Sequence, residues 1–133
     1  MFPDTVTKTL SDAVIQQAQN LSAEERQMLV ISYVPKSQEI WLIQGSEGFV
    51  MLEDKGEARL PVFPHHDLAQ AWLTNNNIDA TCVNVVLSEF NQTWLPGLAN
   101  NKVELVMFPS SDDAQNLVMS ADELAEEWNG NTH

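Results

Sequence analysis

Hydrophobic side chains recur at helical spacing near the start of the chain. Residues 4 to about 20 carry four of them on one stripe: Leu10, Val14, Ile15 and Ala18. Ser22 and Glu25 then form a capping-box pattern, in which each side chain bonds to the backbone N–H of the other residue. This pattern predicts a second helix over about residues 23–33, which Pro35 ends because proline has no N–H to donate. The first predicted elements are therefore a pair of helices.

Short runs of β-prone residues come next. They lie at residues 40–43, 49–52 and 60–63. Glycine-containing turns at 45–48 and 54–56 separate these runs. Short turns between such runs are typical of an antiparallel meander, so we expect one here.

Strands and helices alternate in the rest of the chain. The expected strands lie at residues 82–87, 103–108 and, as a short edge strand, 117–119. Helices are expected after Pro64, from Ser88 to a break at Pro96-Gly97, and from Ser120, which forms a second capping box with Glu123. Their apolar stripes include three tryptophans, which we assign to the core: Trp72, Trp94 and Trp128.

Together these elements predict an α+β fold. It consists of an N-terminal helical pair, an antiparallel β-meander, and then strand/helix alternation that forms one mixed sheet covered by helices. A length of 133 residues without internal repeats fits a single domain over residues 1–133.

The composition is strongly acidic, with 19 acidic and 6 basic side chains and a formal charge of −13. Arg26 and Arg59 are the only arginines, and Lys102 is the only basic residue after Arg59. Binding to nucleic acid or to an anionic membrane needs clusters of Lys and Arg, so we expect neither. The charge leaves three readings open: solubility alone, a basic protein partner, or mimicry of nucleic-acid charge.

Cysteine content and apolar patterning limit the class of protein further. Cys82 is the only cysteine, which excludes a disulfide within the chain and a zinc site built on several cysteines. The first residues show no secretory-signal pattern, and no apolar run approaches the roughly 20 residues that span a bilayer. We therefore expect a cytoplasmic protein.

Several short motifs occur in a fixed order along the chain. They are Ile40-Trp-Leu, Gly48-Phe-Val, Leu60-Pro-Val-Phe-Pro64, Ser88-Glu-Phe, Trp94-Leu-Pro-Gly-Leu98, Val106-Met-Phe-Pro109 and Ser120-Ala-Asp-Glu-Leu124. Over about residues 22–128 they resemble a bacterial family known as domain of unknown function 2750. A looser likeness exists to the N-terminal domain of the enhanced serine sensitivity protein. The resemblance implies no activity, cofactor or catalytic residue, and Phe63, where such sequences often have Trp, suggests packing.

One cluster has residues suited to chemistry: His65, His66 and Asp67, next to Phe63. It lies where the third strand meets a helix, a kind of place that often carries function. Two adjacent histidines at a helix start point in different directions, so a metal ion would need a further ligand from elsewhere. Asp67 also suits the first turn of a helix. A plain helix start explains the cluster, and we expect no cofactor and no metal.

Cys82 is a second candidate for chemistry. It lies in a valine-rich run with no base in the neighbouring sequence. A reactive thiol needs a nearby base or cation, so we expect a buried, unreactive cysteine.

The leading functional hypothesis is a small, acidic, non-catalytic module that binds or regulates another protein. The final helix carries four acids opposite its Leu124 and Trp128 stripe, and this face suits a basic partner: Asp122, Glu123, Glu126 and Glu127. The alternative is a small-molecule or metal-dependent enzyme with a site around Phe63 to Asp67, which predicts a pocket that His65 or His66 faces. The oligomeric state stays open.

Overall fold

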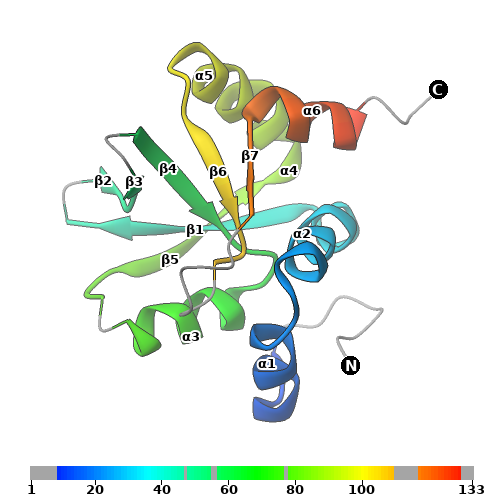
Figure 1. Cartoon of the computed structure of the whole chain (residues 1–133), viewed down its shortest axis with the longest axis vertical. Helices are drawn as coiled ribbons and strands as arrows, with labels where there is room; N and C mark the ends of the chain where they lie inside the picture. Colours follow the sequence, from blue (N-terminus) through cyan, green and yellow to red (C-terminus); the bar gives the residue numbers. More distant parts are fainter. Residues whose placement is uncertain (1–8, 47, 55–56, 77, 110–116, 130–133) are drawn as a thin grey trace.

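A computed structural model describes residues 9–46, 48–54, 57–76, 78–109 and 117–129 (Figure 1). The elements, in chain order, are α1 (Asp12–Gln19), α2 (Ala23–Ser37), β1 (Glu39–Gly45), β2 (Gly48–Phe49), β3 (Leu52–Asp54), β4 (Glu57–Val62), α3 (His66–Asn75), β5 (Thr81–Val86), α4 (Leu87–Glu89), the π-helix η1 (Phe90–Trp94), α5 (Leu95–Asn100), β6 (Glu104–Met107), β7 (Val118–Met119) and α6 (Ala121–Asn129). The predicted α+β class is confirmed. None of the described helices is both long enough and apolar enough to span a membrane.

Serine side chains cap the starts of three helices, α1, α2 and α6. At the start of α1, Ser11 Oγ accepts a hydrogen bond from the backbone N–H three residues later (3.2 Å). At the start of α2, Ser22 Oγ accepts from the N–H of Glu25 (3.2 Å), and the Glu25 carboxylate accepts from the N–H of Ser22 (3.1 Å). Both predicted capping boxes are confirmed, since α6 begins in the same way. Residues 1–8, where the first helix was expected to begin, lie outside the described residues.

Pro35 lies inside α2, and the prediction that it ends this helix is wrong. The helix continues to Ser37, and Gln38 closes it in the left-handed conformation (φ 64°). A proline leaves the carbonyl four residues earlier without its helical donor, which here is the carbonyl of Ile31. That oxygen accepts a hydrogen bond from Trp128 Nε1 on α6 (3.1 Å). A tertiary hydrogen bond therefore replaces the missing helical one and attaches α6 to α2.

Two sheets, rather than the expected single mixed sheet, make up the β-structure. The first has the order β2-β1-β5 and is antiparallel, whereas the second has the order β3-β4-β6-β7 and contains one parallel pair, β4 with β6. Trp41 and Phe63 join them through two backbone hydrogen bonds (3.0 and 2.9 Å). The predicted meander is divided because the run at 49–52 is shared: Phe49 ends β2, whereas Leu52 begins β3.

The predicted break at Pro96-Gly97 is also absent, because a helix runs through it from Leu87 to Asn100. A proline ring collides with the carbonyl four residues before it in a regular α-helix. Here η1 widens the helix directly before the proline, and the N–H of Leu95 donates to the carbonyl of Phe90, five residues earlier. The wider turn changes the spacing between ring and carbonyl, so the helix continues.

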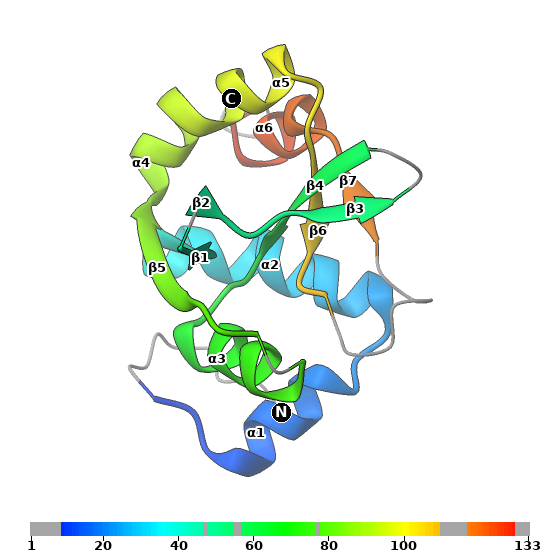
Figure 2. The same cartoon turned by 90° about the vertical axis from the view of Figure 1, so that its left-hand side faces the viewer.

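The core lies between the sheets and the helices. In Figure 2, α2 runs behind the strands, α1 and α3 lie at one end of the molecule, and α4, α5 and α6 lie at the other. The large side chains that are fully buried include Phe63, Phe90 and Phe108, and α2 contributes Val30 and Val34. This arrangement places the start of α3 against both β1 and α1.

Candidate functional site

His65 is the N-cap of α3. Its ring is buried (the residue is 4% exposed), and its Nδ1 accepts a hydrogen bond from the backbone N–H of Asp67 (3.0 Å). The Tyr33 ring of α2 lies 6.2 Å from the imidazole, centroid to centroid. Because Nδ1 is an acceptor here, the ring satisfies one of the N–H groups that every helix start leaves without a helical partner. This contact stabilises the start of α3.

His66 points in a different direction, as the sequence predicts for neighbouring residues at a helix start. Its side chain is 44% exposed, and its Nδ1 lies 3.1 Å from Asp67 Oδ1. The ring meets the Trp41 ring of β1 edge to face, with centroids 5.0 Å apart. The two histidines therefore face different surroundings and do not form one binding pair.

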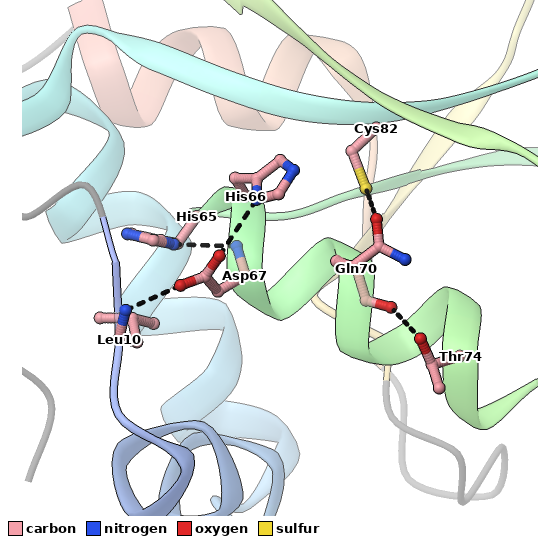
Figure 3. Close-up of polar contacts among 7 residues, drawn as sticks. All are labelled: Leu10, His65, His66, Asp67, Gln70, Thr74 and Cys82. Carbon is pink, nitrogen blue, oxygen red and sulfur yellow. Dashed lines mark hydrogen bonds and ion pairs between the residues drawn. The ribbon is translucent and has the colours of Figure 1, made fainter.

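Asp67 connects α3 to the segment before α1. Its Oδ2 accepts a hydrogen bond from the backbone N–H of Leu10 (2.7 Å), as Figure 3 shows. Burial of the carboxyl acts to raise its pKa, but the hydrogen bonds with His66 and Leu10 and the electrostatic interactions with His65 and His66 together lower it further than burial raises it. The pKa of Asp67 therefore lies below its ordinary value of 3.8.

Phe63, the fourth residue of the predicted cluster, is fully buried. Its ring packs against Trp72 at 5.5 Å and against Phe108 at 6.1 Å, centroid to centroid. Its backbone forms the bridge between the two sheets. Its aromatic ring therefore fills the junction of the two sheets with α3.

A cleft of about 390 Å³ does lie beside this cluster, between α1 and α3. Its lining residues are Asp12, Ile15, Gln16, Gln19, Asp67, Gln70, Ala71, Thr74 and Asn75. Of the four residues singled out from the sequence, Asp67 alone lines this cleft. The structure places Phe63, His65 and His66 elsewhere.

Cys82 of β5 lies close to the same helix. Its thiol donates to Gln70 Oε1 (3.8 Å) and is half-buried rather than fully buried (Figure 3). Burial, together with the negative charge of Asp67, raises the pKa of this thiol to about 11. The thiolate is the reactive form of cysteine, and very little of it is present at neutral pH when the pKa is this high.

Metal binding needs several ligands that meet at one point. Within the ranges that the structure describes, no three or more His, Cys, Asp or Glu side chains are placed to share a metal ion. The described cluster at His65, His66 and Asp67 thus has hydrogen bonds and ring contacts in place of a ligand set.

The acidic face expected on the last helix is present. Its four acids are all exposed: Asp122, Glu123, Glu126 and Glu127. The opposite face of α6 packs inward through Leu124, which is fully buried, and Trp128, which donates to α2. Glu123 also serves the capping box, and Glu127 has an interaction of its own. The helix therefore presents carboxylates to solvent while its apolar stripe holds it in place.

Sequence analysis missed the environment of Arg26. This residue is only 2% exposed, and its guanidinium donates to the carbonyl oxygens of Leu21 (3.2 Å) and Phe108 (2.9 Å). A signal was available, because Arg26 lies on the same helical stripe as Val30 and Val34. An arginine on an apolar stripe indicates that backbone carbonyls lie within its reach.

Comparison with known proteins gives one match. A family model described as "Protein of unknown function (DUF2750)" matches residues 28–128, which confirms the resemblance seen in the sequence motifs and begins six residues later than expected. No curated protein and no solved structure matches. The matched range begins inside α2, so α1 lies outside it.

Proposed function

We propose that this chain, which belongs to the DUF2750 family of proteins of unknown function, is a non-catalytic module that binds a basic protein partner. The observation that carries the proposal is the exposed acidic face of α6, formed by Asp122, Glu123, Glu126 and Glu127. Complementary charge across an interface speeds association and selects partners, so a face of this kind favours a Lys- or Arg-rich surface.

The placement of the basic residues supports the same proposal. Arg26 is buried, and Arg59 Nε lies 3.4 Å from Glu104 Oε1. This distance is within ion-pair range, but the geometry does not make it a hydrogen bond, so we treat the pair as electrostatic only. Arg26 is thus buried and Arg59 is paired with an acid, and among the described basic residues only Lys36 and Lys102 are exposed. The described part of the surface therefore offers little to an anionic ligand and much to a cationic one.

The non-catalytic part of the proposal is supported by the contacts of the reactive residues. His65 Nδ1 holds the N-terminus of α3, the Asp67 carboxylate holds Leu10, and the pKa of Cys82 is raised to about 11. A catalytic acid, base or nucleophile needs a pKa matched to its task and access to a substrate. These three residues are instead engaged in contacts within the fold.

The test is capture of partners from native cytosol by the tagged protein, at low and then raised salt, read by mass spectrometry. Three forms are compared: wild type, D122N/E126Q, and the control D12N/D79N, which removes the same charge from exposed acids elsewhere. Glu123 and Glu127 stay unchanged because they have contacts within the fold. We expect wild type and control to retain one basic protein in stoichiometric amount at low salt and to lose it as the salt concentration rises. We expect D122N/E126Q to retain little of this protein even at low salt.

Two outcomes would contradict the proposal. One is that no basic protein is retained in stoichiometric amount. The other is that D122N/E126Q retains the same protein as well as the control does, since the acidic face of α6 would then contribute nothing.

A second candidate function is binding of a polar small molecule at the cleft between α1 and α3. The specific observation in its favour is that Asp12 and Asp67 line this cleft together with several side-chain amides. The test is a thermal-shift screen, in which the melting temperatures of wild type and D67N are measured with small polar cations and metal ions. A compound that raises the melting temperature of wild type alone would favour this second candidate.

A further inference from the structure

An apolar groove lies between α1 and α2. It has a volume of about 690 Å³ and is lined by Gln17, Ala18, Asn20, Leu21, Glu25, Met28, Leu29 and Ser32. The two helices follow one another closely in the chain, and Figure 1 shows α1 below α2. The volume falls in the range of pockets that take a ligand or a side-chain cluster of a partner.

Met28 is the most exposed hydrophobic side chain of this groove. It is 59% exposed and, with Val86 at 55%, is one of two large hydrophobic side chains exposed on the described part of the surface. Val86 lies on β5, away from any described groove, whereas Met28 stands beside Leu21 and Leu29. A flexible methionine on an apolar surface adapts well to the shape of a bound helix.

The charge of the residues that line the groove indicates the charge of the partner. Glu25 is the only charged residue among the lining residues, and it is an acid. The last turn of α1 forms part of the same lining, and this turn has no basic residue. The carboxyl end of α1 and the amino end of α2 both lie at this groove, and their opposite partial charges offset one another. The side-chain charge of the groove therefore comes from Glu25 alone, and it favours a ligand that brings a positive charge next to its apolar side chains.

A second copy of the chain is a poor occupant on the same grounds. Each copy carries a formal charge of −13, so two copies repel one another. We therefore propose that the α1/α2 groove binds an amphipathic helix from a basic protein, with apolar side chains against Met28 and Leu29 and a Lys or Arg near Glu25. This inference rests on the proposed function, and it adds a second surface and the form of the partner segment.

The probe is a synthetic Lys/Leu peptide of about 18 residues with leucines at helical spacing, together with a Glu/Leu peptide of the same pattern. Each is titrated into ¹⁵N-labelled protein and followed by NMR. The variant M28S removes the exposed methionine, and V86S is its control because Val86 is exposed to a similar extent on a different element. Circular dichroism checks that both variants fold.

We expect the Lys/Leu peptide to shift the amide signals of residues 17–21 and 25–32 most strongly. M28S should weaken its affinity about five- to tenfold, as expected for losing the contact area of one methionine. V86S should leave the affinity unchanged, and the Glu/Leu peptide should not bind.

Other results would overturn the inference. If the peptide shifts the signals of α6 instead and M28S binds as well as wild type, the groove is not the site, while the proposed function stands. If both peptides bind the groove equally, the partner is not selected by charge. If sedimentation shows a dimer that M28S dissociates, the occupant is a second copy. If no peptide binds, the groove does not take a basic helix, and the capture experiment with D122N/E126Q still decides the proposed function.

Discussion

At the scale of single residues, the two arginines occupy opposite environments. Arg26 is buried and donates to two backbone carbonyls, one of them that of Phe108, which has a left-handed backbone (φ 51°). Arg59 is partly exposed and meets Glu104, which is more exposed still. A buried carbonyl that loses its donor is destabilising, whereas a surface ion pair contributes little.

This contrast predicts that R26M and R59M differ in effect. R26M should lower the free energy of unfolding by about 2–4 kcal/mol, because two carbonyl oxygens lose their donor. R59M should lower it by less than about 1 kcal/mol. Urea unfolding of both variants measures the difference. Equal effects would contradict the structural role of Arg26.

Asp67 makes stability depend on pH at the same scale. Because its pKa is lowered in the folded state, the ionised carboxylate stabilises the fold at pH values above its ordinary pKa of 3.8. This stabilisation is lost as the pH falls through the lower, folded-state value. D67N keeps an acceptor for the N–H of Leu10 but has no charge.

We therefore expect D67N to be less stable than wild type by about 1 kcal/mol near neutral pH, because a charge-assisted hydrogen bond becomes a neutral one. The gap should begin to close as the pH falls below 3.8 and should be gone below the lower, folded-state pKa, where wild type also loses its charge. Denaturant unfolding at a series of pH values measures this difference in the free energy of unfolding between wild type and D67N. A gap that stays constant or grows towards low pH would show that the charge of Asp67 does not act through this contact.

At the scale of elements, α6 is attached to α2 at the place where Pro35 removes a helical hydrogen bond. The Ile31 carbonyl accepts from Trp128 Nε1 in place of a backbone N–H. The position of the acidic face therefore depends on a proline in a different helix.

A double-mutant cycle tests this dependence. W128F should destabilise the protein by about 1 kcal/mol or more, because the Ile31 carbonyl loses its donor. In the P35A background the new N–H of residue 35 supplies that carbonyl, so the effect of W128F should be smaller by about 0.5–1.5 kcal/mol. Additive effects of the two substitutions would contradict the link between Pro35 and α6.

Local patterns predicted the elements that depend on neighbouring residues. The two capping boxes, the α+β class and the acidic face of α6 all follow from spacings of a few residues. The predictions that helices end at Pro35 and Pro96 are wrong, because a distant tryptophan accommodates the first proline and a π-helix accommodates the second. Trp128 is far from Pro35 in the sequence, and the residues before Pro96 carry no pattern that distinguishes a π-helix from an α-helix.

Contacts between residues far apart in the sequence explain the remaining differences between the predicted and the observed structure. The division into two sheets depends on which strands meet in space, and Trp41 and Phe63 are far apart in the sequence. The contact of Asp67 with Leu10 is of the same kind, and it places Asp67 at the α1/α3 cleft while His65 turns inward as a cap. The sequence predicted a helix start at these residues but not the side of the molecule that each would face.

At the scale of the whole molecule, the arginines are buried or paired, whereas the acids of α6 are exposed. A chain with a formal charge of −13 buries Arg26 and holds Arg59 in an ion pair, while α6 keeps its four acids exposed. Among the described residues, few cations remain on the surface to balance these acids. Such a surface repels other acidic molecules and attracts basic ones over distances set by the salt concentration.

The measurement that tests the central claim most directly is the affinity of the captured partner for three forms of the protein. This affinity is measured by calorimetric titration of wild type, D122N/E126Q and D12N/D79N, at about 50 mM and about 300 mM salt. We predict that D122N/E126Q binds at least about tenfold more weakly than D12N/D79N at low salt, and that the difference shrinks at high salt. Equal affinity of the two variants at low salt would contradict the claim that the acidic face of α6 binds a basic partner.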